Sequence, residues 1–240
     1  MATRIYIHET ININIRHRKD YLDHFCRVWA PRSRELYGML CFGVWATSGS
    51  TGQWPEAIVM WELADHAAFS AMNSGEFLYL SSVESPSKGH YEEFWDSAPK
   101  GVVESTGFDR LLANMPGSPS LQQAIDDGRR GVGYYHQIIT VTPGGIESYL
   151  EQYDREWRPL AEEHGLVSIG AWRTALGNDS EGVMLWALPQ WSAWEAIDVG
   201  LRRDERARAF HADTAHHTPV WQGKLLAGAQ ENPLDIGRIL

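Results

Sequence analysis

Tyr21-Leu-Asp-His-Phe-Cys-Arg-Val-Trp-Ala-Pro31 is the stretch that decides the fold, because the chain repeats it as Tyr149-Leu-Glu-Gln-Tyr-Asp-Arg-Glu-Trp-Arg-Pro159. Tyr, Leu, Arg, Trp and Pro are identical at matched positions, which are 128 residues apart. A repeat of this kind indicates that one structural unit occurs twice in the chain. We therefore expect the same order of strands and helices around each copy.

The first copy has the pattern of a β-α-β-β-α-β unit. Alternating apolar and polar residues predict half-buried strands, and apolar residues three or four apart predict helices. These patterns predict strands at residues 3–14, 40–47, 57–63 and 108–113, and helices at residues 18–37 and 65–72. Pro31 lies inside the first helix, where its missing N–H should kink or divide the helix, and Pro159 repeats this interruption. An irregular stretch is expected from the second helix to Gly101.

The second copy keeps this order. Its first strand is predicted at residues 133–141, and the Gly-x-Trp motif of the first copy, at residues 43–45, returns at residues 170–172. We predict a first ferredoxin-like repeat at residues 1–113, a linker at 114–131 with a short helical segment at 121–125, and a second repeat at 132–240.

Each β-α-β-β-α-β unit covers only one face of its sheet with helices, so the other face needs a partner. Two units in one chain supply that partner. The sheets are expected to meet face to face and to curl into a barrel with the helices outside. The alternative is two units placed side by side.

The composition excludes several classes of protein. A formal net charge of −10 disfavours nucleic-acid binding, which depends on clustered Lys and Arg. No apolar run approaches the roughly 18 residues of a membrane span, so we expect no membrane association and a cytoplasmic location. Glycine-rich phosphate-binding motifs are absent, so no nucleotide cofactor is expected.

The repeated Gly-x-Trp strand and the strand Met184-Leu-Trp-Ala-Leu-Pro189, which leads into a helix, resemble the NIPSNAP family of the dimeric α+β barrel superfamily. The resemblance covers both halves. It implies an α+β fold in which tandem ferredoxin-like β-α-β-β-α-β repeats form an intrachain dimeric α+β barrel, with a ligand cavity between sheet and helices. Superfamily members include cofactor-free monooxygenases, isomerases, lyase-like decyclases and haem enzymes. Many associate further, so a homo-oligomer stays open.

Two histidines, His8 and His136, are the first candidate catalytic residues. They are 128 residues apart, and each follows an equivalent tyrosine, Tyr6 or Tyr134. The period of two places His8 on the face away from the isoleucines of its strand. If those isoleucines pack under the helices, all four side chains point into the barrel. Histidine titrates near neutral pH and can act as general acid or base. The alternative is a pair of buried histidines that hydrogen-bond within the sheet as relics of duplication.

Glu62 is a third candidate catalytic residue, because it breaks the repeat. It lies in an apolar strand, and its counterpart in the second copy is Ala187. Burial would raise the pKa of this carboxyl and suit it to proton transfer. The alternative is a glutamate at the strand edge that reaches water. Asp109 and Arg110 form a weaker candidate pair, since most such charges are structural.

A late histidine cluster, residues 211–217, is the candidate cofactor site. Haem-binding members of the superfamily place an axial histidine in a comparable late helical region, so the resemblance implies that His211 or His216 could ligate haem iron. Their spacing with Asp213 matches no common metal motif, so no metal site is predicted. The alternative is that these histidines are exposed or cap helices.

Eleven tryptophans suggest both a core and a pocket. Trp45, Trp61, Trp172 and Trp186 recur between the copies and are expected in the core. The less symmetric tryptophans are candidates to line a pocket for a flat apolar ligand: Trp54, Trp95, Trp191 and Trp194.

Three functions remain open from the sequence. The leading hypothesis is an enzyme without a nucleotide cofactor, an isomerase, lyase or monooxygenase, that acts by His/Glu acid–base chemistry. Its substrate would be a small hydrophobic molecule, aromatic or polyketide-like, bound in the barrel. The second is a haem enzyme of the same fold, and the third is a non-catalytic ligand-binding or scaffold protein.

Overall fold

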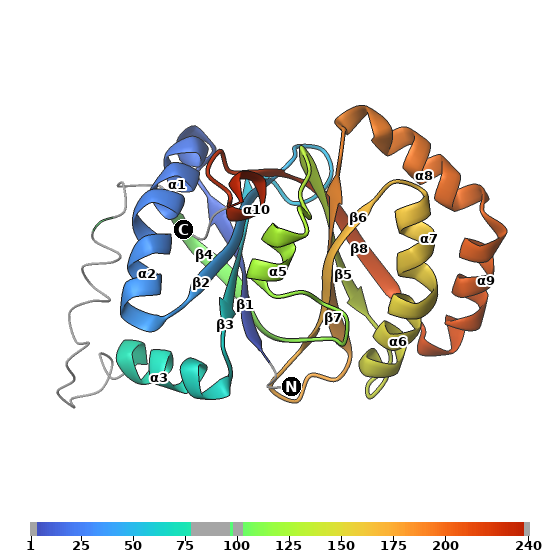
Figure 1. The fold of residues 1–240 in the computed structure, drawn as a ribbon, viewed down its shortest axis with the longest axis horizontal. Coiled ribbons are helices and arrows are strands. Elements are labelled where there is room, and N and C mark those ends of the chain that lie inside the picture. The colour runs from blue at the N-terminus through green and yellow to red at the C-terminus, as the bar shows by residue number, and fades with distance from the viewer. Residues whose placement is uncertain (1–3, 78–96, 98–102, 238–240) are drawn as a thin grey trace.

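The computed structural model describes residues 4–77, 97 and 103–237, and its strands form one closed antiparallel barrel (Figure 1). The strands are β1 (Ile5–Ile13), β2 (Leu40–Thr47), β3 (Glu56–Leu63), β4 (Val103–Asn114), β5 (Gly133–Thr140), β6 (Val167–Thr174), β7 (Glu181–Leu188) and β8 (Val220–Gly228). Their order around the barrel is β1-β3-β2-β8-β5-β7-β6-β4. The halves join through β2–β8 and β4–β6, so the expected intrachain α+β barrel is confirmed. The boundaries of the repeats at residues 113 and 132 stay a prediction.

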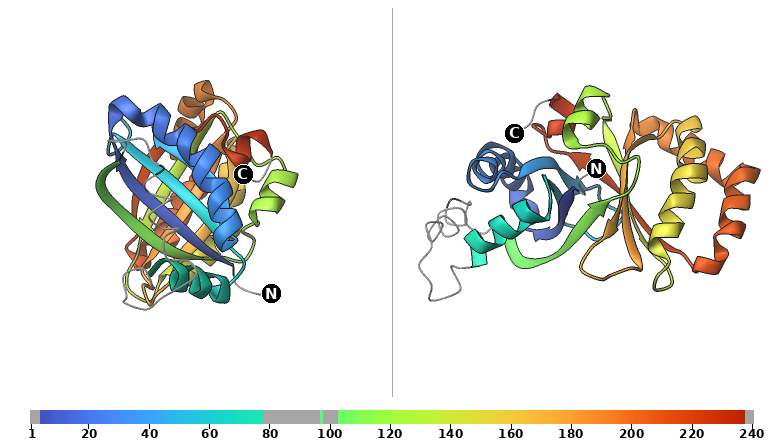
Figure 2. Two further views of the ribbon diagram at one scale, coloured as in Figure 1. Left: turned by 90° about the vertical axis from the view of Figure 1, so that its left-hand side faces the viewer. Right: turned by 60° about the horizontal axis from the view of Figure 1, so that its bottom comes forward.

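Helices cover the outside of the barrel on two opposite sides (Figures 1 and 2). The helices of the described residues are α1 (Arg18–His24), α2 (Ala30–Tyr37), α3 (His66–Phe77), α5 (Leu121–Asp126), α6 (Ile146–Gln152), α7 (Arg158–Glu163), α8 (Trp194–Arg203), α9 (Glu205–Asp213) and α10 (Pro233–Ile236). None of these helices combines the length and the apolar character needed to traverse a lipid bilayer. Leu121, Ala124 and Leu234, from α5 and α10, belong to the core inside the barrel, so these two helices close one of its ends.

A π-helical turn divides the first long helix of each repeat. Phe25–Trp29 separates α1 from α2, and Tyr153–Trp157 separates α6 from α7. The N–H of Ala30 donates to the carbonyl of Phe25, five residues earlier. Pro31 follows in the first turn of α2, and because helical backbone precedes it, its missing N–H leaves a carbonyl of the preceding turn without its usual helical donor. The interruption predicted from the prolines is confirmed, and it takes the form of a wider turn just before each proline.

Two elements are longer than the sequence indicated. β4 begins at Val103 and not near residue 108, because its backbone pairs with β1 from Ala113 opposite Ile5 to Gly107 opposite Ile11 and, after a shift in register, again at Val103 opposite Ile13. α3 continues to Phe77, and the predicted N-cap is confirmed: Asp65 Oδ1 accepts from the N–H of Ala68 at 2.8 Å. The irregular stretch expected up to Gly101 lies almost entirely outside the described residues.

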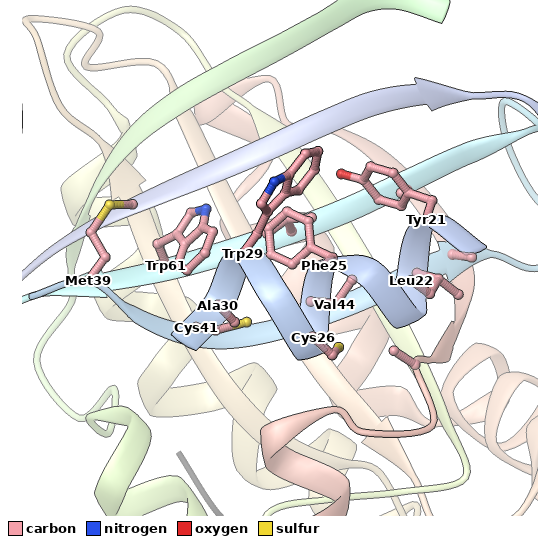
Figure 3. Close-up of a cluster of buried hydrophobic side chains, with 14 of the residues drawn as sticks. Tyr21, Leu22, Phe25, Cys26, Trp29, Ala30, Met39, Cys41, Val44 and Trp61 are labelled. Carbon is pink, nitrogen blue, oxygen red and sulfur yellow. The ribbon is translucent and has the colours of Figure 1, made fainter. Parts of the chain in front are cut away.

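The outer face of each sheet packs against its helices. In the first half, Phe25 packs against Trp61, and Tyr21 and Trp29 pack against Phe25 in the same cluster, as Figure 3 shows. The indole N–H of Trp61 donates to Glu9 Oε1 at 3.1 Å, which explains the one acidic residue on the isoleucine face of β1. The second half repeats this device, with Trp186 donating to Gln137 at 3.0 Å.

The inner core depends on the Gly-x-Trp motif. Residues two apart on a strand share a face, and the Trp45 ring folds back over Gly43, where a Cβ atom would lie 2.1 Å from the ring. The two inner tryptophans, Trp45 and Trp172, are fully buried, and each packs edge-on against a tyrosine of the other half, at centroid distances of 5.5 Å to Tyr134 and 5.6 Å to Tyr6. The motif therefore links the two repeats.

Replacing Gly43 with alanine should destabilise the barrel, because the new methyl group overlaps the Trp45 ring. We expect the free energy of unfolding in urea to fall by about 3 kcal/mol, in the upper range of overpacking costs. Gly49→Ala is the matched control, since its Cβ would meet nothing closer than 3.7 Å. Equal stability of the two variants would contradict this account of the motif.

Candidate functional site

His8 and His136 meet inside the barrel. β1 and β5 carry them, and their Nε2 atoms are 2.8 Å apart. The rings are nearly coplanar, with an interplanar angle of 14° and centroids 5.0 Å apart, so they meet edge to edge. Both side chains are almost fully buried. The two histidines, which occupy matched positions 128 residues apart, are therefore in direct contact across the two halves.

The contact between the two Nε2 atoms determines which ring nitrogens carry a proton. A hydrogen bond between two Nε2 atoms needs one donor and one acceptor, so each neutral ring takes a different tautomer. Neither Nδ1 atom has a hydrogen-bond partner among the described residues, and both are shielded from solvent. An unpaired buried nitrogen is costly unless a ligand or water bonds to it. The pair therefore has unused hydrogen-bonding capacity.

Two cations flank the histidines, each held by a carboxylate from the other half. In the strand registers Arg110 lies opposite His8, and Lys224 lies opposite His136. Arg110 Nε donates to Glu181 Oε1 at 2.7 Å, and Lys224 Nζ pairs with Glu56. Because β4 and β8 pair with β1 and β5, one ion pair stands beside each histidine.

The sequence also contains a signal for these cations. The offset of 114 residues that relates the last strands of the repeats joins Arg110 to Lys224. The offset of 125 residues that relates the third strands joins Glu56 to Glu181. Applied to charged residues, the same offsets mark the two cations as one matched pair and the two carboxylates as another, but they do not show which cation binds which carboxylate.

Burial and nearby charge keep both histidines neutral. Burial, followed by the positive charges of Arg110 and Lys224, lowers the pKa of His8 to about 3. Burial, the neighbouring His8 and the same two cations lower the pKa of His136 well below its usual value. A neutral imidazole with an unpaired nitrogen can accept a proton or bind a ligand group that donates one.

A cavity of about 290 Å³ reaches this group from the barrel end opposite α5 and α10. Along β1 the inward side chains run from Tyr6 near the closed end to Thr10, which lines the cavity. We name this cavity the mouth pocket; its lining is Thr10, Gly52, Gln53, Glu56, Phe108, Arg110, His136, Ile138, Gln222, Gly223 and Lys224. His136 is therefore the histidine nearer to an incoming ligand, with His8 behind it.

Glu62, Tyr6 and Tyr134 lie toward the closed end. The Tyr6 hydroxyl donates to Glu62 Oε2 at 2.8 Å, and the same oxygen accepts the N–H of Leu121 at the start of α5 at 2.9 Å. Burial raises the pKa of Glu62, although these hydrogen bonds oppose the rise. Glu62 is buried and does not reach water at a strand edge. Its contacts attach α5 to the barrel.

Tyr134 has a matching acid from a different element. Its hydroxyl bonds to Asp235 of α10, and burial raises the pKa of that carboxyl to about 6. This contact explains why Ala187 can replace the strand glutamate in the second half. Each inward tyrosine binds one carboxylate, taken from β3 in the first half and from α10 in the second.

A second cavity, of about 500 Å³, lies between the outer face of the second sheet and its helices. We name it the outer pocket; its lining is Tyr135, Trp157, Leu166, Trp194, Asp198, Leu201, Arg202, Ala207, Arg208, His211 and Trp221. His211 belongs to it, with its ring beside those of Trp157 and Trp221 at 5.1 and 5.2 Å. His216 is exposed outside it and bonds to the carbonyl of Asp213. The structure thus separates the two candidate haem ligands.

The recurring tryptophans lie where the sequence predicts, whereas only one of the less symmetric tryptophans that the structure describes lines one of the two named cavities. The four that recur between the copies are buried in the core. Of the less symmetric ones, Trp194 lines the outer pocket, Trp54 and Trp191 are exposed on the surface, and Trp95 lies outside the described residues. Among the residues that the structure describes, no group of three or more His, Cys, Asp or Glu side chains is placed to hold a metal ion.

Comparison with known proteins identifies the fold. No family model and no curated protein matches this sequence. Among solved structures, an anthrone oxidase-like protein aligns over 95% of this chain and 92% of its own, with a TM-score of 0.59 and 12% identity. A Fusobacterium nucleatum protein with a provisional monooxygenase assignment aligns over 95% and 94%, with a TM-score of 0.58 and 8% identity. At these identities the likeness shows the dimeric α+β barrel fold alone.

Two other solved structures match different shares of the chain. A protein with a provisional chlorite dismutase assignment covers 98% of both chains, with a TM-score of 0.50 and 12% identity. A NIPSNAP family protein of unknown function from Agrobacterium tumefaciens covers 44% of this chain and 95% of its own, with 22% identity and a TM-score of 0.39.

The buried histidines should make the protein sensitive to acid. An unfolded histidine binds a proton below about pH 6.5, whereas folded His8 stays neutral down to about pH 3. Between these values only the unfolded chain gains the proton, so stability falls as the pH falls, by about 1.4 kcal/mol per pH unit for each histidine. Urea unfolding from pH 7 to pH 5 should therefore show a shallower loss of stability for His136→Gln than for the unchanged protein. His66→Gln, at an exposed site, should follow the unchanged protein, and parallel curves for all three would refute the assignment.

Proposed function

We propose that this dimeric α+β barrel is an enzyme that moves a proton on a small molecule bound in the mouth pocket, with His136 as the base. One observation carries the proposal: a cavity leads to a buried, neutral histidine whose Nδ1 has no hydrogen-bond partner among the described residues. Structural neighbours with oxidase-like and provisional monooxygenase assignments agree with a small-molecule enzyme of this fold.

The proton would be taken by Nδ1 of His136. In the matching tautomer, His136 donates its Nε2–H to Nε2 of His8, and this leaves the Nδ1 lone pair free. When Nδ1 accepts a proton, the bond to His8 becomes charge-assisted and therefore stronger. The second histidine thus stabilises the charged form of the first, although burial and two cations oppose that charge.

His8 has a positioning role in this proposal. It lies behind His136 at 2.8 Å, and it does not line the mouth pocket. Its hydrogen bond fixes the tautomer and the orientation of the catalytic ring, as a second-layer partner does at many histidine sites. Glu62, Tyr6 and Tyr134 take no part in the proton transfer, because their hydrogen bonds connect them to α5 and α10.

A pure scaffold is the less favoured function. A scaffold would have a filled interior in which both histidines are satisfied by backbone groups. The two unpaired Nδ1 atoms and the polar cavity that reaches His136 argue against that function.

Proton transfer can be tested before a substrate is known. A panel of small ketones and enones is incubated with the protein in heavy water, and proton NMR follows the loss of signals from carbons next to the carbonyl. We expect exchange of at least one compound, reduced by about 100-fold or more in His136→Gln, since this is the usual contribution of a general base. His8→Gln should shift the pH profile of the remaining activity, because it changes the tautomer partner.

His66→Gln serves as the control, because this histidine is exposed on α3. Undiminished exchange in both His136→Gln and His8→Gln would remove these histidines from the mechanism. Loss of exchange in the control would point to a general effect of histidine replacement.

Haem binding in the outer pocket is the second candidate function, and one observation favours it: His211 lines an aromatic cavity of about 500 Å³. The residues fit a flat ring system, since the His211 imidazole lies beside the rings of Trp157 and Trp221 and would be the ligand of the haem iron, and partial burial lowers the pKa of His211. Arg202 and Arg208 lie on the same lining and could pair with carboxylate groups of the ligand. Bound haem would supply redox chemistry.

Haemin titration tests whether His211 or His216 binds the haem iron. We expect a saturable shift of the Soret band that is lost in His211→Ala and retained in His216→Ala, because only His211 lines the pocket. A shift that survives in His211→Ala, or no shift at all, would exclude His211 as the ligand of the haem iron.

A further inference from the structure

We infer that Arg110 and Lys224 are catalytic residues that hold an oxyanion, and that the substrate is a small neutral carbonyl compound that ionises to an enolate. The inference rests on the proposed proton transfer and adds the class of molecule that loses the proton. It is carried by the arrangement of charge around the mouth pocket.

The two cations converge on the cavity from opposite sides of the histidine pair. Arg110 and Lys224 both line the mouth pocket, and both are largely buried, with 14% and 13% of their side chains exposed. They come from β4 and β8, which pair with the strands that carry His8 and His136. A carbonyl group placed beside His136 would therefore have a donor-rich cation within the same pocket.

The cations retain donors after they bind their carboxylates. A guanidinium has five N–H donors and an ammonium has three. Arg110 uses Nε and Nη2 on Glu181, at 2.7 and 3.4 Å, and Lys224 bonds to Glu56. Each therefore has N–H groups left that can bond to a substrate oxygen.

The balance of charge selects a neutral substrate. Two cations, two carboxylates and two neutral histidines give the group no net charge. An anionic ligand would leave a net negative charge in a largely buried site, which is unfavourable. A neutral ligand that gives its proton to His136 creates an anion and a cation together, so the net charge stays at zero.

The size and walls of the pocket restrict the ligand further. A volume of about 290 Å³ lies at the lower limit of ligand cavities, so the substrate is near the size of one ring. Phe108 and Ile138 provide apolar walls. The guanidinium carbon of Arg110 lies 4.5 Å from the centre of the Phe108 ring, and this contact helps to hold the cation in place.

The step is balanced without an oxidant or a reductant. The C–H bond next to the carbonyl breaks, its proton goes to Nδ1 of His136, and its electron pair forms the enolate, with the negative charge on oxygen. Arg110 and Lys224 bind that oxygen more strongly than they bound the neutral carbonyl, which lowers the barrier. Return of the proton to another carbon of the conjugated system gives an isomer.

The experiment uses 4-nitrophenol, a one-ring neutral acid whose phenolate absorbs visible light. The protein is titrated into the phenol in a buffer below the pKa of the phenol. We expect a saturable rise in phenolate absorption with one site per chain. The double variants Glu56→Gln/Lys224→Gln and Arg110→Gln/Glu181→Gln each remove one ion pair without leaving a charge unpaired, and each should weaken the signal by about tenfold or more.

The control is Arg27→Gln/Glu231→Gln, which removes an ion pair of 2.8 Å that lies outside the mouth pocket and should leave the signal unchanged. Bound phenol without phenolate absorption, or equal signals from all the double variants, would overturn the inference. Phenolate formation that persists in His136→Gln would support the cations as the oxyanion site and count against His136 as the base. The exchange measurement in heavy water tests that base independently.

Discussion

The structure depends on the burial of one sheet face against another within a single chain. Each half has a four-stranded sheet with helices on one side, and its other side is stable only if it is covered. The connecting ladders β2–β8 and β4–β6 have only three residue pairs each. The barrel is therefore held mainly by its interior, where Trp45 packs on Tyr134 and Trp172 packs on Tyr6. These contacts cross between the halves, so neither sheet has a complete core alone.

The same crossing contacts produce the candidate site. Because both sheets turn equivalent faces inward, residues that match in the repeats come close to one another near the barrel axis. His8 meets His136 there, and each ion pair joins a cation of one half to a carboxylate of the other. Burial of such polar groups without partners would be unfavourable in free energy. Here they pair with one another, which offsets the loss of contact with water. The site belongs to the whole barrel and not to one repeat.

Residues that match between the two repeats and residues that differ between them have different roles in this molecule. The mouth pocket combines matched residues, whereas the closed end uses Glu62 in one half and Asp235 in the other to bind equivalent tyrosines. The outer pocket with His211 lies in the second half, where α8 and α9 cover the sheet. An asymmetric residue therefore does not by itself indicate chemistry. In Glu62 it reflects the attachment of α5 to the barrel.

The sequence by itself determined the repeat, the order of its strands and helices, and the inward face of each first strand. These features follow from local periodicity and from the 128-residue offset, and both can be read directly from the linear sequence. Only the tertiary structure decided that the two histidines touch, that Arg110 and Lys224 stand beside them, and that Glu62 binds α5. Those contacts depend on strand register and on how the two sheets close around each other. Register is set by packing between segments far apart in the chain, so no local pattern contains it.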